Sequence, residues 1–223
     1  IIGSGIGGMG TVTEQNRVLF ERGPNRVSPF LIPMILPEGA ASMVAIEFGL
    51  KGPNMAVTSA CATGANAIGE AYRVIQYGMA DIGVCGGSEA GVIEIALAGF
   101  GAMRAISVRN DEPERASRPF DRERDGFVIG EGAGVLVLES LEHALARGAT
   151  IHGELIGYSS NDDAYHITAP DPDGAGATAC MRLALESAGL QPEEVDYINA
   201  HGTSTLLNDA TETRAIKEAL GQH

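Results

Sequence analysis

The amino-acid sequence predicts a layered α/β fold, in which helices pack on a buried sheet. Short apolar runs without polar alternation, typical of strands covered on both faces, occupy residues 81–85 and 134–138. Longer segments carry apolar residues at helical spacing, at residues 62–77, 176–187 and 209–220. The alternation of these two patterns indicates an α/β architecture.

The remaining elements follow from the same patterns. Gly78 is placed to end the first of these helices, and a short helix is expected at residues 141–147. Residues 105–126 are rich in Arg, Asp, Glu and Pro and lack periodicity, so we expect an ordered surface excursion there. Three further runs are typical of strands, at residues 55–58, 151–158 and 195–200.

The pattern of strands and helices restarts after Gly148, which indicates a second unit. We therefore expect two domains, at residues 1–150 and 151–223. The chain begins with Ile1 inside an apolar run instead of with methionine, which leads us to expect that the sequence is part of a longer protein.

Composition indicates an acidic globular protein. Of the 223 residues, 44% are hydrophobic and 20% are charged, a balance that allows a substantial core without disulfides or metal, and we expect no cofactor. The formal net charge of −14 argues against a nucleic acid or an anionic membrane as a partner. The three cysteines are odd in number and widely separated, which fits the reducing cytoplasm and argues against a zinc site.

One cysteine stands where a predicted strand feeds a helix, in the Thr-Ser-Ala-Cys-Ala-Thr-Gly sequence of residues 58–64. Backbone amides and the positive end of the helix dipole favour a thiolate at this point, so Cys61 is the candidate nucleophile. The alternative is a buried, inert cysteine. We prefer that alternative for Cys85, inside an apolar run, and for Cys180, on a helix face.

A histidine stands at the end of a predicted strand, in the Asn-Ala-His-Gly-Thr-Ser-Thr sequence of residues 199–205. Loop histidines are more often solvated than catalytic, but a histidine and a cysteine at the ends of different strands are what cysteine-based acyl chemistry requires. His201 is therefore the candidate catalytic imidazole. Asp209 and Glu212 have the spacing of an N-terminal capping pair, and they would also fix the loop that carries His201.

Two glycine-rich segments resemble nucleotide-binding loops in residue pattern but not in sequence context. Residues 3–8 fit the G-x-G-x-x-G pattern, but the segment that follows is a poor match to the helix of that motif, and the next acidic candidate, Glu21, does not end a second strand. Residues 126–134 lack the Lys-Ser/Thr ending of a phosphate loop and lead into a strand. Both segments predict close backbone packing instead of a nucleotide site.

Together these motifs resemble the β-ketoacyl-acyl-carrier-protein synthases, nearest to the type II elongating enzymes. The likeness runs through the entire chain and implies part of a thiolase-like layered α/β/α/β/α fold made of two similar halves. Besides the cysteine and histidine motifs, it rests on Ser-Pro-Phe at residues 28–30, Gly-Gly-Ser-Glu at 86–89, Gly-Phe at 99–100, Ser-Arg-Pro-Phe-Asp at 117–121, Arg-Asp-Gly-Phe at 124–127 and Gly-Glu-Gly-Ala-Gly at 130–134.

The resemblance implies a decarboxylative condensation on acyl carrier protein substrates. Cys61 would take the acyl chain from the carrier's phosphopantetheine thioester, and its backbone N–H would contribute to an oxyanion hole. His201 would help drive the decarboxylation of the malonyl group. By the same likeness, the pantetheine arm would be bound by Thr203, Thr205 and Thr168, the acyl channel would be lined by Ile6 and Phe100, and the acidic carrier protein would dock on Arg26 and Arg104.

The resemblance also implies a homodimer, paired through residues 55–59, in which residues 30–35 reach toward the partner's acyl channel. The family's second catalytic histidine, its lysine and its glycine-rich gating loop lie beyond the last helix and are not in this sequence, and His223 stands in no such context. One carrier-docking position departs from the family, because Asn25-Arg26 stands where relatives often have two basic residues.

Three alternatives stay open. A modular polyketide ketosynthase is the nearest rival, although its cysteine and histidine motifs typically differ. A non-catalytic chain-length partner usually lacks the nucleophile that Cys61 supplies. A thiolase-type degradative enzyme would act on coenzyme A substrates instead of carrier-protein substrates.

Overall fold

The computed structural model describes residues 1–221 and divides into two compact units. Unit 1 comprises Ile1–Ala96 and Gly130–Glu154, and unit 2 comprises Leu97–Ile129 and the chain from Leu155 onward. Each unit is thus assembled from two stretches of the chain. The predicted organisation into halves at residues 1–150 and 151–223 stays a prediction.

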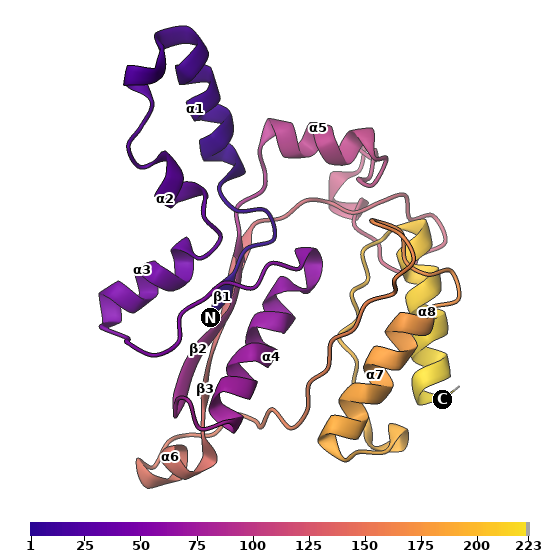
Figure 1. Cartoon of the computed structure of the whole chain (residues 1–223). Helices are drawn as coiled ribbons and strands as arrows, with labels where there is room; N and C mark the ends of the chain where they lie inside the picture. The colour runs from indigo at the N-terminus through magenta and orange to yellow at the C-terminus, as the bar shows by residue number, and fades with distance from the viewer. Residues whose placement is uncertain (222–223) are drawn as a thin grey trace. The chain divides into compact units, whose positions relative to one another are not determined.

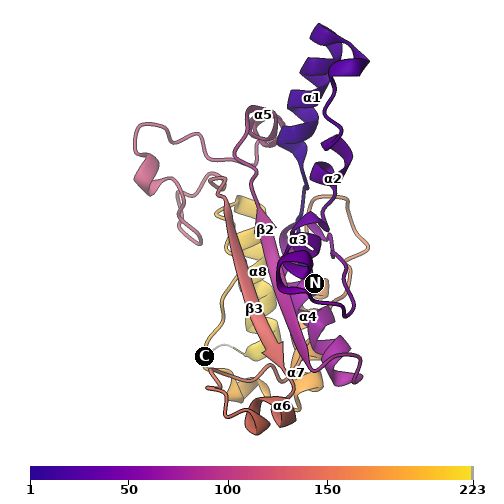
Figure 2. The same cartoon turned by 90° about the vertical axis from the view of Figure 1, so that its left-hand side faces the viewer.

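Unit 1 is built on a three-stranded sheet of order β1-β2-β3. β1 (Ile2–Gly3) pairs in parallel with β2 (Ile82–Glu89), and β2 runs antiparallel beside β3 (Gly132–Glu139) along its whole length (Figure 2). α4 (Thr63–Gln76) lies along this sheet and contacts all three strands (Figure 1). The residues that α4 buries are mostly small, which lets the helix lie close to the sheet: Thr63, Ala67, Gly69 and Ala71.

The predicted helices of unit 1 are confirmed. The segment expected at residues 62–77 is α4, which ends at Gln76 with Tyr77 as its C-cap. Gly78 follows with φ of +67°, and its N–H donates to the carbonyl of Ile75, so it serves as the expected stop. The short helix expected at residues 141–147 is α6. α6 spans Leu141–Ala146. The other helices of this unit are α1 (Met9–Arg22), α2 (Leu31–Ile35), α3 (Gly39–Phe48) and the start of α5 (Glu94–Ala102), which continues into unit 2.

Unit 2 contains two longer helices, α7 (Ala175–Ala188) and α8 (Leu206–Leu220), which pack against each other (Figure 1). Both were expected from the sequence, although α8 begins at Leu206 instead of Asp209. The excursion at residues 105–126 has little regular structure, as its composition predicts. It carries a short 3-10 turn at Pro113–Arg115 and one residue of an isolated bridge between Ile106 and Phe127. Across the described part of the chain, no helix is both long enough and apolar enough to span a bilayer.

Three of the predicted strands are wrong. Residues 82–85 of the first predicted run lie in β2, and residues 134–138 lie in β3. In contrast, residues 55–58, 151–158 and 195–200 form no strand ladder with any described segment. A strand needs a hydrogen-bonding neighbour, and apolar patterning alone does not supply one. The expected burial of β3 on both faces is also wrong. β3 stands at the edge of the sheet, and Val137 is 64% exposed.

An ion cluster joins the end of β3 to α6. The two guanidinium nitrogens Nε and Nη2 of Arg147 each lie 2.7 Å from a carboxylate oxygen of Glu139, and the Nδ1 atom of His143 contacts the same carboxylate. The hydrogen bonds from Arg147, and then that from His143, lower the pKa of Glu139 to about 2. Ser140 caps α6 beside this cluster, because its hydroxyl accepts the N–H of His143. The cluster thus fixes the direction in which the chain leaves the sheet.

The Glu139 cluster should make stability depend on pH in the acidic range. The lowered pKa means that the stabilisation is fully present above the unfolded value near 4.5 and is lost as pH falls toward 2. We therefore expect Glu139→Gln to lower the thermal unfolding midpoint at pH 7 and to match the unsubstituted protein near pH 2. The control is Glu142→Gln, which neutralises an exposed carboxylate in the first turn of the same helix. A midpoint difference that stayed constant from pH 7 to pH 2 would contradict the role given to this ion pair.

Candidate active site

Cys61 lies on a sharp turn that leads into α4. The turn is a single 3-10 turn, Ala60–Ala62, and its first residue adopts a left-handed conformation with φ of 50°. Such a conformation costs a non-glycine residue roughly 1–3 kcal/mol, so the surrounding contacts must hold it. The N–H of Ser59 donates to the hydroxyl of Thr63 at 2.9 Å, and the N–H of Ala62 donates to the carbonyl of Ser59 at 3.1 Å. These bonds clamp the two ends of the turn around the cysteine.

The glycines of the predicted close-packing loop hold the turn from the other side. A Cβ atom at Gly3 would lie 2.2 Å from the carbonyl oxygen of Val57 and 2.3 Å from the Cγ2 atom of Thr63, so only glycine fits there. At Gly8 a Cβ atom would lie 2.2 Å from the carbonyl oxygen of Met34. The prediction that this segment serves close backbone packing is confirmed. A helix does follow it, since α1 begins at Met9, contrary to the expected mismatch.

The surroundings of the three cysteines differ in the way that the sequence predicts. Cys61 is exposed and precedes the first residue of α4, where the positive end of the helix dipole favours a thiolate. Cys85 is fully buried in β2, and burial raises the pKa of its thiol. Cys180 is half-buried on α7, and its Sγ atom lies 3.3 Å from the hydroxyl of Ser159. Cys61 alone combines exposure with a helix N-terminus.

Limited alkylation should distinguish these thiols. With substoichiometric iodoacetamide at neutral pH, we expect peptide mapping of the full-length protein to find the label on Cys61 first, because only this thiol joins exposure to a favoured thiolate. Cys180 serves as the internal control, because it is a partly accessible thiol that lies within a helix and not at its N-terminus. If the label reached Cys180 before Cys61, the assignment of Cys61 as the nucleophile would be wrong.

Within unit 1, the turn that carries Ile6 lies beside the cysteine turn. Ile6 is 37% exposed and its N–H donates to a carboxylate oxygen of Glu89, at the end of β2, at 3.0 Å. The same oxygen accepts the N–H of Gly5 at 2.8 Å. Backbone amides that would bind phosphate in a nucleotide loop are therefore occupied by a carboxylate of the chain itself. This supports the interpretation that the glycine-rich spelling is not a dinucleotide site.

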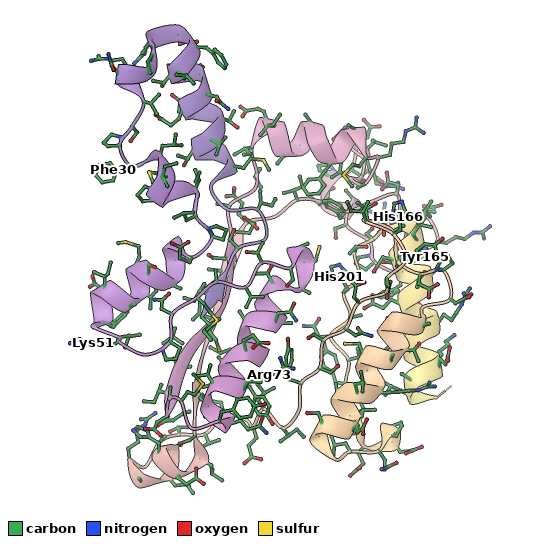
Figure 3. The ribbon with its side chains drawn as sticks, in the orientation of Figure 1. Phe30, Lys51, Arg73, Tyr165, His166 and His201 are labelled. Carbon is green, nitrogen blue, oxygen red and sulfur yellow. The ribbon has the colours of Figure 1, made fainter. Side chains whose placement is uncertain are left out.

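Within unit 2, a carboxylate of α8 holds the histidine loop by its backbone. The two oxygens of Glu212 accept the N–H of His201 at 2.6 Å and the N–H of Gly202 at 2.8 Å. Figure 3 labels His201 on the segment that leads into α8, where the imidazole is exposed. Glu212 therefore fixes the backbone of the loop that carries the imidazole.

Asp209, a second carboxylate of α8, is buried in a network of polar groups. It is 1% exposed, and it accepts the N–H of Phe120 at 2.7 Å and the N–H of Ser204 at 3.2 Å. Its Oδ2 atom also lies 3.2 Å from Nε of Arg124, which donates to the carbonyl oxygen of Thr205. The network ties the histidine loop to residues 118–126 of the same unit.

The expected capping role of Asp209 and Glu212 is wrong, because α8 begins at Leu206. Its N-cap is Thr205, whose hydroxyl accepts the N–H of Asn208 at 3.2 Å. The second part of the prediction is confirmed, since both carboxylates accept loop amides and fix the loop that carries His201.

The other predicted site residues fall on surfaces of both units. In unit 2, the Thr203 and Thr205 hydroxyls lie 2.9 Å apart, Thr168 is exposed, and Phe100 packs edge-on against Phe127 with ring centroids 5.2 Å apart. Arg104 is exposed in unit 2 and Arg26 is exposed in unit 1. His223 lies outside the described residues. Cys61 and Ile6 belong to unit 1 and His201 to unit 2, so their convergence in one site stays a prediction.

Two family models match this chain almost end to end. Residues 1–144 match the model for the N-terminal domain of beta-ketoacyl synthases, and residues 152–223 match the model for the C-terminal domain. The chain belongs to the β-ketoacyl synthase family. The resemblance predicted from the motifs is thereby confirmed.

Named relatives of this β-ketoacyl synthase chain agree with the type predicted from its motifs. It is 57% identical over 223 residues to a 3-oxoacyl-[acyl-carrier-protein] synthase 2 of Synechocystis sp., covering 100% of the chain and 54% of the relative. It is 53% identical over 221 residues to the protein of the same name from Staphylococcus aureus, covering 99% and 55%. The chain thus spans about half the length of the curated relatives it matches.

Solved structures of ketosynthases share its fold. A beta-ketoacyl synthase from Burkholderia phymatum STM815 aligns with a TM-score of 0.92 at 40% identity, covering 99% of this chain and 53% of that one. A type II PKS acyl-carrier protein in complex with its ketosynthase, bound to the hexaketide, aligns with a TM-score of 0.91 at 37% identity, covering 99% and 57%. The predicted thiolase-like α/β fold, of which this chain holds part, is confirmed.

Sequence reasoning missed two charged residues that organise the loops of this β-ketoacyl synthase. In the sequence Arg124 is only part of a family motif, yet its guanidinium also donates to the carbonyl of Leu206 at 2.9 Å. Glu89 was likewise only a motif residue. Its signal in the sequence is a lone carboxylate at the end of an apolar strand, which needs partners at that position.

Proposed function

We propose that the full-length protein containing this chain is a 3-oxoacyl-acyl-carrier-protein synthase that elongates fatty acyl chains in the cytoplasm. The observation that carries this proposal is the placement of Cys61, exposed on a left-handed turn at the N-terminus of α4. The names of the relatives at 57% and 53% identity support the carrier-protein substrates.

The reaction starts with a transfer of the acyl group. The Cys61 thiolate attacks the carbonyl carbon of the acyl thioester, and the carrier's phosphopantetheine leaves as a thiolate, which takes up a proton from water. The N–H of Cys61 is the donor that we assign to the developing oxyanion. The product of this half-reaction is an acyl thioester on Cys61.

The second half-reaction forms the carbon–carbon bond. The malonyl group on a second carrier protein loses CO₂, and His201 donates a hydrogen bond to the developing enolate oxygen. The carbanion attacks the carbonyl carbon of the Cys61 acyl thioester, and the Cys61 thiolate leaves. The product is a 3-oxoacyl thioester that is two carbons longer, and no electrons are exchanged with a redox partner.

The remaining assignments follow the family likeness and the exposures described above. We assign the pantetheine arm to Thr203, Thr205 and Thr168, and the hydroxyl of Thr205 is shared with its capping bond to α8. The acyl chain is assigned to a channel lined by Ile6 and Phe100, and the acidic carrier protein to Arg26 and Arg104. Arg26 and Arg104 are both exposed, and neither belongs to an ion pair among residues 1–221. The two domains at residues 1–150 and 151–223 are assigned to the two similar halves of the family.

The comparisons rank one of the alternatives, and the structure bears on another. A polyketide ketosynthase is the second candidate, favoured by the solved type II polyketide complex at 37% identity, which is lower than the 57% to the relative from Synechocystis. A non-catalytic chain-length partner is disfavoured by the exposed thiol of Cys61. A degradative thiolase-type enzyme would require coenzyme A substrates.

The test is an elongation assay on the full-length protein. We expect it to convert an acyl-carrier-protein thioester and malonyl-carrier-protein into a 3-oxoacyl thioester that is two carbons longer, with release of CO₂. The same assay with coenzyme A thioesters should give a much lower rate. Repeated extension without reduction of the keto groups would favour the polyketide ketosynthase. Thiolysis of 3-oxoacyl-coenzyme A without malonyl-dependent elongation would overturn the proposal.

We further propose that the full-length protein is a homodimer paired through residues 55–59. That segment forms no ladder among the described residues, and exposed apolar side chains lie on α2 and its N-cap: Phe30, Ile32 and Met34. Figure 3 shows Phe30, which is 65% exposed, projecting away from the α2 ribbon. An apolar surface of this kind needs a cover in water.

Sedimentation of the full-length protein tests the dimer. At micromolar concentration we expect the mass of two chains. We expect Phe30→Asp to shift the equilibrium toward monomer, because it places a charge on the surface that the proposed dimer buries. Phe20→Asp is the control, since Phe20 is an equally apolar and 85% exposed residue on α1. A fully active monomer at this concentration would contradict the assignment.

A further inference from the structure

Glu89 ends β2 with a carboxylate that collects three hydrogen-bond donors from one turn. Its Oε2 atom accepts the N–H of Gly5 at 2.8 Å and the N–H of Ile6 at 3.0 Å. Its Oε1 atom accepts the hydroxyl of Ser4 at 3.1 Å. The Ser4 oxygen in turn accepts the N–H of Gly7 at 2.8 Å. A single half-buried side chain therefore determines the shape of residues 4–7.

This turn touches the backbone that precedes the nucleophile, inside the same unit. The carbonyl of Ser4 accepts the hydroxyl of Thr58 at 3.2 Å. A Cβ atom at Gly5 would lie 3.2 Å from the carbonyl oxygen of Ala60, so the two backbones are in close contact there. Ala60 is the residue held at φ of 50° immediately before Cys61. A shift of residues 4–7 would therefore release a support of the strained turn.

We propose that Glu89 is a positioning residue, which holds the 4–7 turn against the nucleophile turn and so fixes both Cys61 and Ile6. This inference deepens the proposed function and rests on it for the roles of those two residues. Without the carboxylate, the amides of Gly5 and Ile6 lose their acceptor, and the turn has no other described side chain that would hold them. A displacement of about 1 Å at a reacting group costs on the order of 10²-fold in rate.

A purely structural role for Glu89 is the competing explanation, and Glu131 provides the matched control. Its Oε1 atom accepts the N–H of Val92 at 2.9 Å, in the loop that follows β2. It therefore makes the same kind of carboxylate-to-backbone bond beside the same end of the sheet, since Glu89 pairs with Gly132. Among the described residues, Glu131 makes no hydrogen bond to residues 4–7 or to Ala60, so its loss should destabilise the protein without displacing the cysteine.

The experiment compares Glu89→Ala, Glu89→Gln and Glu131→Ala in the full-length protein. Three quantities are measured: the thermal unfolding midpoint, the rate of Cys61 alkylation by iodoacetamide at neutral pH, and kcat/KM as a function of acyl-chain length. We expect Glu89→Ala to lower kcat/KM about 10- to 100-fold, to slow alkylation of Cys61, and to change the preferred chain length because Ile6 moves. Glu89→Gln retains an acceptor oxygen and should recover most of the loss.

The outcomes separate this inference from the proposed function. If Glu89→Ala and Glu131→Ala have equal effects on alkylation and on chain-length preference, Glu89 is structural and the inference is overturned. If the unsubstituted protein shows no elongation but Glu89→Ala still slows alkylation of Cys61, the proposed function fails and the positioning role stands. If Glu89→Ala does not fold, Ser4→Ala replaces it as the test variant. This substitution removes one donor to the carboxylate and the acceptor of the Gly7 N–H, so we expect a smaller effect of the same kind. A Ser4→Ala protein that behaved like the unsubstituted one would overturn the inference.

Discussion

Replacement of Cys61 by alanine in the full-length protein should abolish acyl transfer. In enzymes that use covalent catalysis, removal of the nucleophile lowers kcat by about 10⁴-fold or more, because binding and oxyanion stabilisation alone remain. Alanine should also be tolerated at position 61, because the left-handed residue of the turn is Ala60, with φ of 50°, and the Cys61 side chain is exposed. We therefore expect loss of activity without loss of folding.

Two measurements check this expectation. Intact mass after incubation with an acyl-carrier-protein thioester should show an acyl adduct on the unsubstituted protein and none on Cys61→Ala, and the thermal midpoints should agree within a few degrees. Cys180→Ala is the control, because this thiol is half-buried on α7 and has no assigned part in the chemistry. An acyl adduct that persists in Cys61→Ala would mean that another group is the nucleophile.

Replacement of Asp209 by alanine should strongly destabilise unit 2. Asp209 is 1% exposed, and its loss leaves the N–H groups of Phe120 and Ser204 without their acceptor. The guanidinium of Arg124, whose side chain is 14% exposed, also loses its ion partner. Breaking one side of a buried ion pair typically costs about 3–5 kcal/mol. Because the same carboxylate holds the loop of His201, we also expect a lower elongation rate in the protein that remains folded.

An exposed ion pair of the same unit supplies the control. The Asp173 carboxylate lies 3.6 Å from Arg214, and the Asp173 side chain is 90% exposed, so Asp173→Ala should cost about 1 kcal/mol or less. Urea unfolding of both variants measures the difference. Equal unfolding free energies for Asp209→Ala and Asp173→Ala would show that the buried network does not hold the loop.

Elements that are stabilised by local interactions could be predicted from the sequence. Apolar residues at helical spacing, together with Gly78 as a C-terminal stop, are enough to specify α4, because a helix makes its hydrogen bonds within one segment. The cysteine motif could be located for the same reason, since its properties come from the start of that helix. Here local pattern and observed structure agree.

Features that depend on residues far apart in the chain could not be predicted from the sequence and are seen only in the folded structure. The runs at residues 55–58, 151–158 and 195–200 have strand composition but no ladder among the described residues, because pairing is a property of two segments and not of one. Glu89 lies 83 residues from the Ile6 N–H that it accepts, and Asp209 lies 89 residues from that of Phe120. Spacing in the sequence carries no record of such contacts. The chemistry of Cys61 could therefore be anticipated from local sequence, whereas the carboxylates that hold the loops around Cys61 and around His201 became visible only in the folded units.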